Sequence, residues 1–158
     1  MSTAIVMDRT AKHKIADFLS KVLSDTYVLY VKTQNFHWNV VDPRFFALHK
    51  MLDEQYHSLA EAIDEIAERI RALEYRAPGS MQQFLDQATL SEAENNLQAN
   101  AMLQQLVEDH MTLANLIRPW IPESQKHGDE GTADLLIERL RFHEKTAWML
   151  RSHFSDKH

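Results

Sequence analysis

The side chains best suited to chemistry in this 158-residue chain are one histidine and two carboxylates. His37 lies in the segment NFHWN, residues 35–39, and Asp64 and Glu68 follow one predicted helix later, four residues apart. Nitrogen and carboxylate ligands from two neighbouring helices are what an oxygen-handling iron site needs. Carboxylates are hard donors that stabilise Fe(III), and neutral imidazole suits Fe(II). These three residues are therefore candidate iron ligands.

The composition indicates an all-helical chain. Only three glycines and four prolines occur, whereas residues with high helix propensity are plentiful. The length suffices for one domain with a real core, so we expect a single domain over residues 1–158 with a short tail over residues 1–8. The absence of cysteine excludes disulfides, thiolate metal sites and a thiol nucleophile.

Net charge and hydropathy argue against a nucleic acid or a membrane as a general binding partner of this chain. The net charge of −6 argues against nucleic-acid binding over the whole surface. No apolar stretch approaches the roughly 20 residues that span a bilayer, and the first residues lack the basic region of a signal peptide. We expect a cytoplasmic protein with no membrane partner, and nucleoid association stays open.

Hydrophobic periodicity predicts four long helices joined by one long connection. The predicted ranges are about 9–36, 43–76, 91–118 and 132–154. Asp42 and Pro43 are the expected N-cap and first residue of the second helix, and Ser91 opens a capping box for the third. The connection, with a short helical turn over residues 80–85, is longer than an antiparallel hairpin needs. This pattern predicts a ferritin-like four-helix bundle with a crossover.

Helical phase places four candidate ligands on one flank of the second predicted helix. With about 100° per residue and His49 at zero, the other three lie at about 40°, 60° and 100°: Asp53, Asp64 and Glu68. They lie beside the Leu and Ile stripe that would form the core. At about 1.5 Å per residue, His49 and Glu68 are about 28 Å apart, too far for one ion. If both ends form one site, two chains must pair antiparallel, with His37 of one chain approaching the carboxylates of the other, and a two-fold axis would produce two such sites.

Each residue also has a plainer role open to it. Carboxylates four residues apart, such as Asp64 and Glu68, are common on solvated helical faces, and a histidine like His37 often has a purely structural role. Only the combined arrangement favours a metal site. A centre inside the bundle would need Glu-x-x-His on two helices. The chain has one copy, from Glu54 to His57, which projects away from the core stripe.

At these residues the chain closely resembles the Dps family, the DNA-binding proteins from starved cells, also called mini-ferritins. The resemblance extends over nearly the whole chain and rests on five segments: NFHWNV (35–40), FALHKMLDE (46–54), IDEIAERI (63–70), GTAD (131–134) and EKTAWML (144–150). The most specific part of the resemblance is the spacing from His37 through His49, Asp53 and Asp64 to Glu68.

The resemblance implies a homo-dodecameric hollow cage with ferroxidase sites at its two-fold interfaces. The residues that match the ligands of one subunit are His37, His49 and Asp53, and those of its partner are Asp64 and Glu68. Such a protein oxidises Fe(II), preferably with hydrogen peroxide, at a di-iron or mono-iron site and stores ferric mineral in the cage. The implied function is iron storage and protection of DNA and the cell from oxidative damage.

Four further expectations follow from the resemblance. Glu68 is expected to be the strongest ligand and the iron bridge. Trp38, next to His37, is expected either to donate electrons that quench stray radicals or to pack at the interface. Acidic residues at the start of the last predicted helix are expected to line iron-entry pores, and the alternative is a favourable interaction with the helix N-terminus: Asp129, Glu130 and Asp134. Acidic residues on another face of the second predicted helix are expected to nucleate mineral, and the alternative is a plain solvated face: Glu54, Glu61 and Glu65.

The chain departs from the family at two places. Some members bind DNA through a long lysine-rich tail, but residues 1–8 contain Asp8 and no lysine. DNA binding is therefore expected to be weak or absent, although a DNA-compacting nucleoid protein with incidental metal binding is the alternative function. In addition, Glu74, Tyr75 and Arg76 replace the glycine-bearing end expected for the second helix, which predicts an altered turn.

Overall fold

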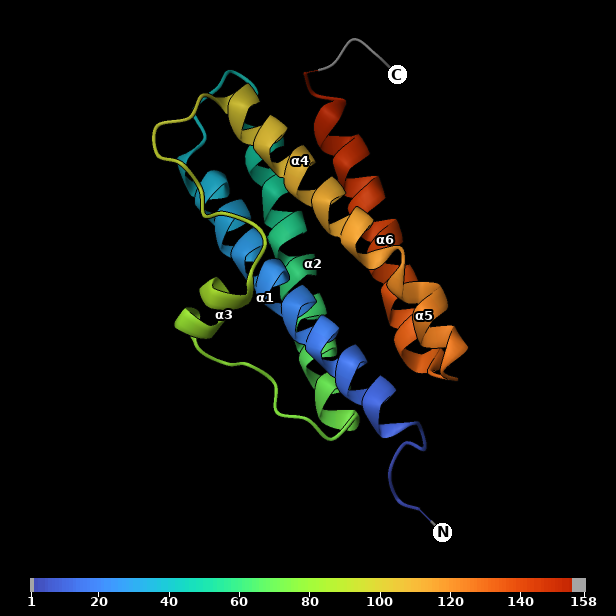
Figure 1. Cartoon of the computed structure of the whole chain (residues 1–158). Helices are drawn as coiled ribbons and strands as arrows, with labels where there is room; N and C mark the ends of the chain where they lie inside the picture. Colours follow the sequence, from blue (N-terminus) through green and yellow to red (C-terminus); the bar gives the residue numbers. More distant parts are fainter. Residues whose placement is uncertain (1, 155–158) are drawn as a thin grey trace.

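The computed structural model describes residues 2–154, and α-helices are the only regular elements in that range (Figure 1). The helices are α1 Arg9–Asn39, α2 Phe45–Ala72, α3 Met81–Gln87, α4 Ala99–Ile117, α5 Trp120–Lys126 and α6 Glu130–Arg151. α1 packs along α2 and α4 along α6, and α3 lies against α1 within the crossover from α2 to α4. This confirms the predicted all-α ferritin-like bundle with a short helix in the crossover. The predicted domain also includes positions 1 and 155–158, which lie outside the described residues.

The corner between α1 and α2 differs from the prediction. α1 continues to Asn39, so His37 lies inside the helix rather than at its end. The predicted cap at Asp42 is wrong, because α2 begins at Phe45 and its N-cap position is Arg44. The Asp42 carboxylate instead accepts hydrogen bonds from the backbone N–H and the Nε–H of Arg44, at 2.7 and 2.8 Å. Aspartate commonly forms such a local turn. Arg44 also donates to the His153 carbonyl at 2.6 Å, which ties this corner to the end of α6.

The start of α4 was predicted wrongly. α4 begins at Ala99, eight residues after Ser91, and the intervening segment is irregular. Asn96 adopts a left-handed backbone with φ +63°, which is incompatible with a continuous α-helix. Just before the segment, the buried Asp25 carboxylate of α1 accepts the backbone N–H groups of Thr89 and Leu90 at 2.6 and 2.9 Å. The crossover is therefore fastened to α1 before α4 can begin.

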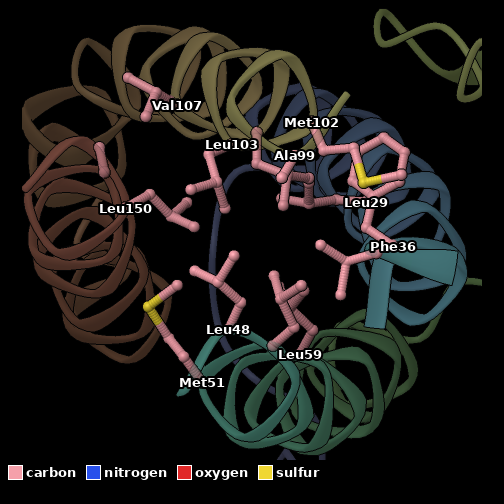
Figure 2. Packing of buried hydrophobic residues seen from close by; sticks show 14 of the residues in the cluster. Leu29, Phe36, Leu48, Met51, Leu59, Ala99, Met102, Leu103, Val107 and Leu150 are labelled. Carbon is pink, nitrogen blue, oxygen red and sulfur yellow. The ribbon is translucent and has the colours of Figure 1, made fainter. Parts of the chain in front are cut away.

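The core consists of two hydrophobic clusters. One of them joins all four long helices, and in Figure 2 Phe36, Leu48, Leu103 and Leu150 converge on one interior. The other lies at the opposite end of the bundle and includes Ile66 and Leu136. Each long helix contributes a stripe of fully buried residues to this interior, so burial of apolar surface fixes the bundle and the relative positions of α1 and α2.

A buried polar layer lies between the two clusters. Along α6, Leu136 belongs to one cluster and Ala147 to the other, and Arg139 and His143 lie between them. The Nδ1 atoms of His110 on α4 and His143 are 2.9 Å apart, and both imidazoles are fully buried. Burial, followed by the Arg139 charge, lowers the pKa of His110 to about 3, and burial lowers the pKa of His143 well below 6.5. Both imidazoles are therefore neutral at physiological pH.

This layer predicts a specific acid sensitivity. Because both histidines have a lowered pKa in the folded state, the unfolded chain binds more protons below its pKa of 6.5, and stability falls as pH decreases from there toward 3. The loss is about 1.4 kcal/mol per histidine for each pH unit. The midpoint of thermal unfolding of the wild-type protein should fall steeply from pH 8 to pH 4.5, and it should fall less steeply in a His110→Gln, His143→Gln variant.

Protonation of two buried carboxylates changes the stability of the fold in the opposite direction. Burial raises the pKa of Asp25 and of Asp109, so the folded state binds extra protons and each gains relative stability as pH falls through its raised pKa. Asp25 and Asp109 are present both in the wild-type protein and in the His110→Gln, His143→Gln variant. Their contribution therefore cancels when the dependence of stability on pH is compared between the two proteins. Equal slopes in the two proteins would contradict the assignment to the histidine pair.

The end of α2 contains a left-handed residue that is not glycine. Glu74 has φ +73°. The Tyr75 N–H donates to the Ile70 carbonyl at 3.2 Å and the Glu74 N–H to the Arg71 carbonyl at 2.9 Å. This pair of bonds defines a Schellman cap, whose left-handed position normally holds glycine because a Cβ atom is strained there. The turn predicted to be altered therefore keeps the usual geometry at a conformational cost.

Glu74→Gly should stabilise the protein. The substitution removes the strain, worth about 1 kcal/mol, and loses only an exposed 3.4 Å ion pair with Lys12. The midpoint of thermal unfolding should rise by about 2–4 °C. Glu74→Ala is the control, since it loses the same ion pair but keeps the strained Cβ, and its midpoint should not rise. A gain in the alanine variant as large as in the glycine variant would refute the strain argument.

Candidate metal centre

Reciprocal hydrogen bonds lock His37 of α1 against His49 of α2. The Nδ1 atom of His37 lies 2.7 Å from the His49 carbonyl oxygen, and the Nδ1 atom of His49 lies 2.7 Å from the His37 carbonyl oxygen. A carbonyl oxygen can only accept, so both Nδ1 atoms carry the proton. In the neutral rings both Nε2 atoms then have a free lone pair. The rings stack with their centroids 3.8 Å apart, which holds the two nitrogens in fixed positions.

Asp53 lies one turn after His49 and faces His37. Its Oδ1 atom is 3.8 Å from the Nε2 atom of His37, and that imidazole is nearly buried while the carboxylate is 43 % exposed. With Nδ1 protonated, the neutral ring presents a lone pair to a negatively charged oxygen, an unfavourable arrangement unless a cation or proton lies between them. Metal–nitrogen and metal–oxygen bonds of about 2.0–2.2 Å span such a gap. The geometry therefore suits a divalent cation.

Two neighbours of this group were not predicted as site residues. The Tyr56 ring lies 5.2 Å from His37, and the His57 ring stacks on Tyr56 at 4.3 Å. The pKa of Tyr56 is raised, first by desolvation and then by the Asp53 charge. Their spacing of three and four residues from Asp53 is the sequence signal that could have found them.

Asp64 and Glu68 do not join this group within one chain. Both are exposed on later turns of α2, and the eleven residues from Asp53 to Asp64 correspond to about 16 Å along the axis. In the part of the chain that the structure describes, no three His, Asp or Glu side chains lie close enough to hold a metal ion. One chain thus places the His37 imidazole beside His49 and beside Asp53, and leaves the other two predicted ligands, Asp64 and Glu68, apart from them.

The residue after Glu68 anchors that end of α2. Arg69 donates to the Asp129 carboxylate at 2.6 Å and to the Thr132 hydroxyl at 3.1 Å. Asp129 is 2 % exposed and also caps α6 by accepting the Thr132 N–H at 3.0 Å. A Cβ atom on Gly131 would come to 2.7 Å from the Arg69 guanidinium, so a larger residue there would displace that group. Asp129 therefore has the capping role that was the alternative to pore lining.

The other acidic candidates and Trp38 are accessible. Glu130 and Asp134 are exposed on α6, and the three predicted nucleation residues are exposed on α2: Glu54, Glu61 and Glu65. Trp38 is 63 % exposed and lies at the α1–α2 corner, where Val41 and Phe46 are also exposed. A single chain thus leaves an apolar corner beside the His37 group uncovered.

Comparisons with known proteins agree with this architecture. Residues 16–157 match the family model of the ferritin-like domain. The chain is 43 % identical to an uncharacterised low temperature-induced protein of Nostoc, over 87 % of this chain and 78 % of that protein. It is 35 % identical to DNA protection during starvation protein 2 of Bacillus anthracis, over 88 % of this chain and 95 % of that protein.

A solved structure has the same fold. The Dps protein of Vibrio cholerae, described as a member of a broad superfamily of ferritin-like diiron-carboxylate proteins, superposes with a TM-score of 0.89. It is 31 % identical to this chain, and the match covers 98 % of this chain and 100 % of that protein. Among the described helices, none is long and apolar enough to cross a membrane.

The Arg69 anchor predicts which acidic residue near the start of α6 matters for stability. Asp129→Ala should lower the free energy of unfolding by about 2–4 kcal/mol, because it leaves a guanidinium without its partner and α6 without its cap. Asp134→Ala on the same helix, where the side chain is exposed, should change it by less than about 0.5 kcal/mol. Thermal unfolding of both variants tests this, and similar midpoints would refute the anchoring role.

Proposed function

Because the chain belongs to the ferritin-like family and, within it, to the Dps group, we propose that it is an iron-storing and iron-detoxifying protein that oxidises Fe(II) at centres shared between two chains. The observation that supports this most directly is the lone pair of His37 facing the Asp53 carboxylate across 3.8 Å. Iron is the substrate here, and twelve chains would form the cage that stores the ferric product.

Two half-sites would complete each centre. His37, His49 and Asp53 of one chain supply imidazole nitrogens and a carboxylate, and Asp64 and Glu68 of a second chain supply two further carboxylates. The exposure of Asp64 and Glu68 leaves them free for that contact. Hard carboxylate oxygens favour the ferric product, so the complete ligand set would stabilise Fe(III) relative to Fe(II). Glu68 is the proposed bridging ligand.

The proposed reaction balances with hydrogen peroxide as the preferred oxidant. Two Fe(II) ions give one electron each, the O–O bond breaks, and the two oxygen atoms leave as hydroxide or, with protons, as water. Because both electrons arrive together, no hydroxyl radical is released. Trp38, one residue from His37 and exposed, is the proposed electron donor when iron and peroxide meet in unequal amounts. Protection of DNA would follow from removal of iron and peroxide, without direct DNA contact.

The shared site makes a sharp prediction about mixed assemblies. His37→Ala and Asp64→Ala should each abolish most rapid Fe(II) oxidation by peroxide, followed anaerobically by Fe(III) absorbance. In a pair that contains one chain of each variant, one site loses both residues and the other keeps all of them. Co-expression in equal amounts with random pairing should therefore restore roughly a quarter of the wild-type rate.

A control variant tests whether the loss of activity is specific to the proposed ligands. His127→Ala, at a histidine distant in sequence that pairs with Glu123, should oxidise Fe(II) like wild type. If the co-assembled variants stay inactive while wild type is active, the ligands do not come from two chains. A wild-type rate equal to that of a His37→Ala, Asp64→Ala double variant would refute ferroxidase activity altogether.

A further inference from the structure

We propose that a pocket between α2 and α6 is a phosphate site, in which the Arg139 guanidinium binds the oxyanion and glutamates at the rim bind a trivalent cation that accompanies it. This inference deepens the proposed function and rests on it for the identity of the cation, Fe(III), which is the product of the oxidation. Arg139 lies outside the set of five residues proposed above as ligands of the shared centre.

Arg139 carries a buried charge without a partner. The residue is 5 % exposed, and its Nε and Nη2 atoms are buried with no hydrogen-bond partner. The Arg69 guanidinium binds Asp129 at 2.6 Å, but no ion pair within residues 2–154 includes Arg139. Its guanidinium lies over the Phe142 ring, 4.4 Å from the centroid. Because a buried charge without a counter-ion is costly, this group is prepared to bind an anion.

The guanidinium keeps its charge at neutral pH. Burial lowers the pKa of Arg139 to about 10, and the charges of Glu138 and Glu65 act in the opposite direction. Both carboxylates are thus near enough to influence Arg139, although neither forms an ion pair with it. The space between the buried cation and these carboxylates is open to a ligand.

That space is a pocket of about 150 Å³, and Arg139 and Ser58 are both in its lining. The Nη1 atom of Arg139 has no hydrogen bond and is not among the buried guanidinium nitrogens, so it is the atom that a ligand in the pocket reaches first. A phosphate oxygen on Nη1 leaves a second oxygen beside Nη2, which is the fork that arginine offers to phosphate. The Ser58 hydroxyl can donate to a third oxygen.

Exposed carboxylates surround this pocket: Glu61, Glu65 and Glu138. They would repel a phosphate ion that arrives alone. In the described part of the chain, they also do not come close enough together to hold a metal ion by themselves. A trivalent cation removes both difficulties, because it binds carboxylate and phosphate oxygens at once, and Fe(III) prefers such hard donors. One buried positive charge behind three exposed negative charges therefore fits a metal phosphate better than either ion alone.

The test counts bound phosphate by equilibrium dialysis of the assembled protein. The probes are radiolabelled inorganic phosphate and one redox-inert Ga³⁺ per chain, supplied as its nitrilotriacetate complex. Wild type should bind roughly tenfold more phosphate with Ga³⁺ than without it, because each ion favours binding of the other. Arg139→Gln should lose roughly nine-tenths of the Ga³⁺-dependent phosphate, since an amide offers neither the charge nor the fork. Arg141→Gln, at an exposed arginine of the same helix outside the pocket, should bind like wild type.

A second variant keeps the buried residue intact. Glu65→Gln, Glu138→Gln alters only exposed positions of the rim, and it should lower the Ga³⁺-dependent phosphate several-fold. The proposal is overturned if Arg139→Gln binds as much phosphate as wild type, if the rim variant does so, or if wild type binds equal amounts with and without Ga³⁺.

Ga³⁺ separates this proposal from the proposed function, because the phosphate count needs no oxidation of Fe(II). If wild type oxidises Fe(II) but Arg139→Gln matches it in phosphate, the phosphate site alone is refuted. If wild type does not oxidise Fe(II) but Arg139→Gln still loses the Ga³⁺-dependent phosphate, the pocket stands as a metal-phosphate site and the proposed function fails.

Discussion

Two reciprocal hydrogen bonds between His37 and His49 are the constraint on which the candidate centre depends. Each imidazole uses its Nδ1–H to satisfy a backbone carbonyl of the other helix, so the same contact joins α1 to α2 and sets both tautomers. Because the rings are stacked and that of His37 is nearly buried, their free nitrogens have little rotational freedom. Metal-binding histidines are commonly oriented by such a bond from the second nitrogen. The corner that links the two longest helices is thus also the part of the chain prepared to bind a cation.

The length of α2 explains why one chain offers only part of a ligand set. A straight α-helix fixes Asp53 and Asp64 about 16 Å apart, and no side-chain rotation closes that distance. The carboxylate end is itself held firmly, because Arg69 next to Glu68 is bound to buried Asp129 and packs on Gly131. Both ends of α2 are therefore rigid and separate. On the proposed function, assembly would be required for activity, since only a second chain could bring the ends together.

Much of the fold was predictable because helix periodicity and rise depend on local sequence. The hydrophobic stripe predicted the bundle, helical phase placed His49, Asp53 and Glu68 on one flank, and helical rise separated Glu68 from His49. Two capping motifs misled the prediction. The Asp42 carboxylate binds Arg44 instead of capping α2, and the segment after Ser91 follows a crossover that Asp25 fastens to α1. The tautomers were not predictable, because they depend on carbonyl groups twelve residues away in the chain. His57 was noticed only as part of a Glu-x-x-His motif, and its proximity to Asp53 required the side-chain geometry.

The bundle centre shows why the chemistry belongs at the flank. It contains two neutral imidazoles, His110 and His143, which by composition alone look like metal ligands. Burial and, to a smaller extent, the charge of buried Arg139 lower the pKa of both rings, and a site that disfavours a proton in this way disfavours a divalent ion as well. No third His, Asp or Glu among the described residues completes a metal cluster with this pair. The His37 group differs, since the Nε2 lone pair of His37 faces the Asp53 carboxylate, which is 43 % exposed and open to water. Electrostatics, more than the number of histidines, therefore distinguishes the candidate centre from the polar layer of the core.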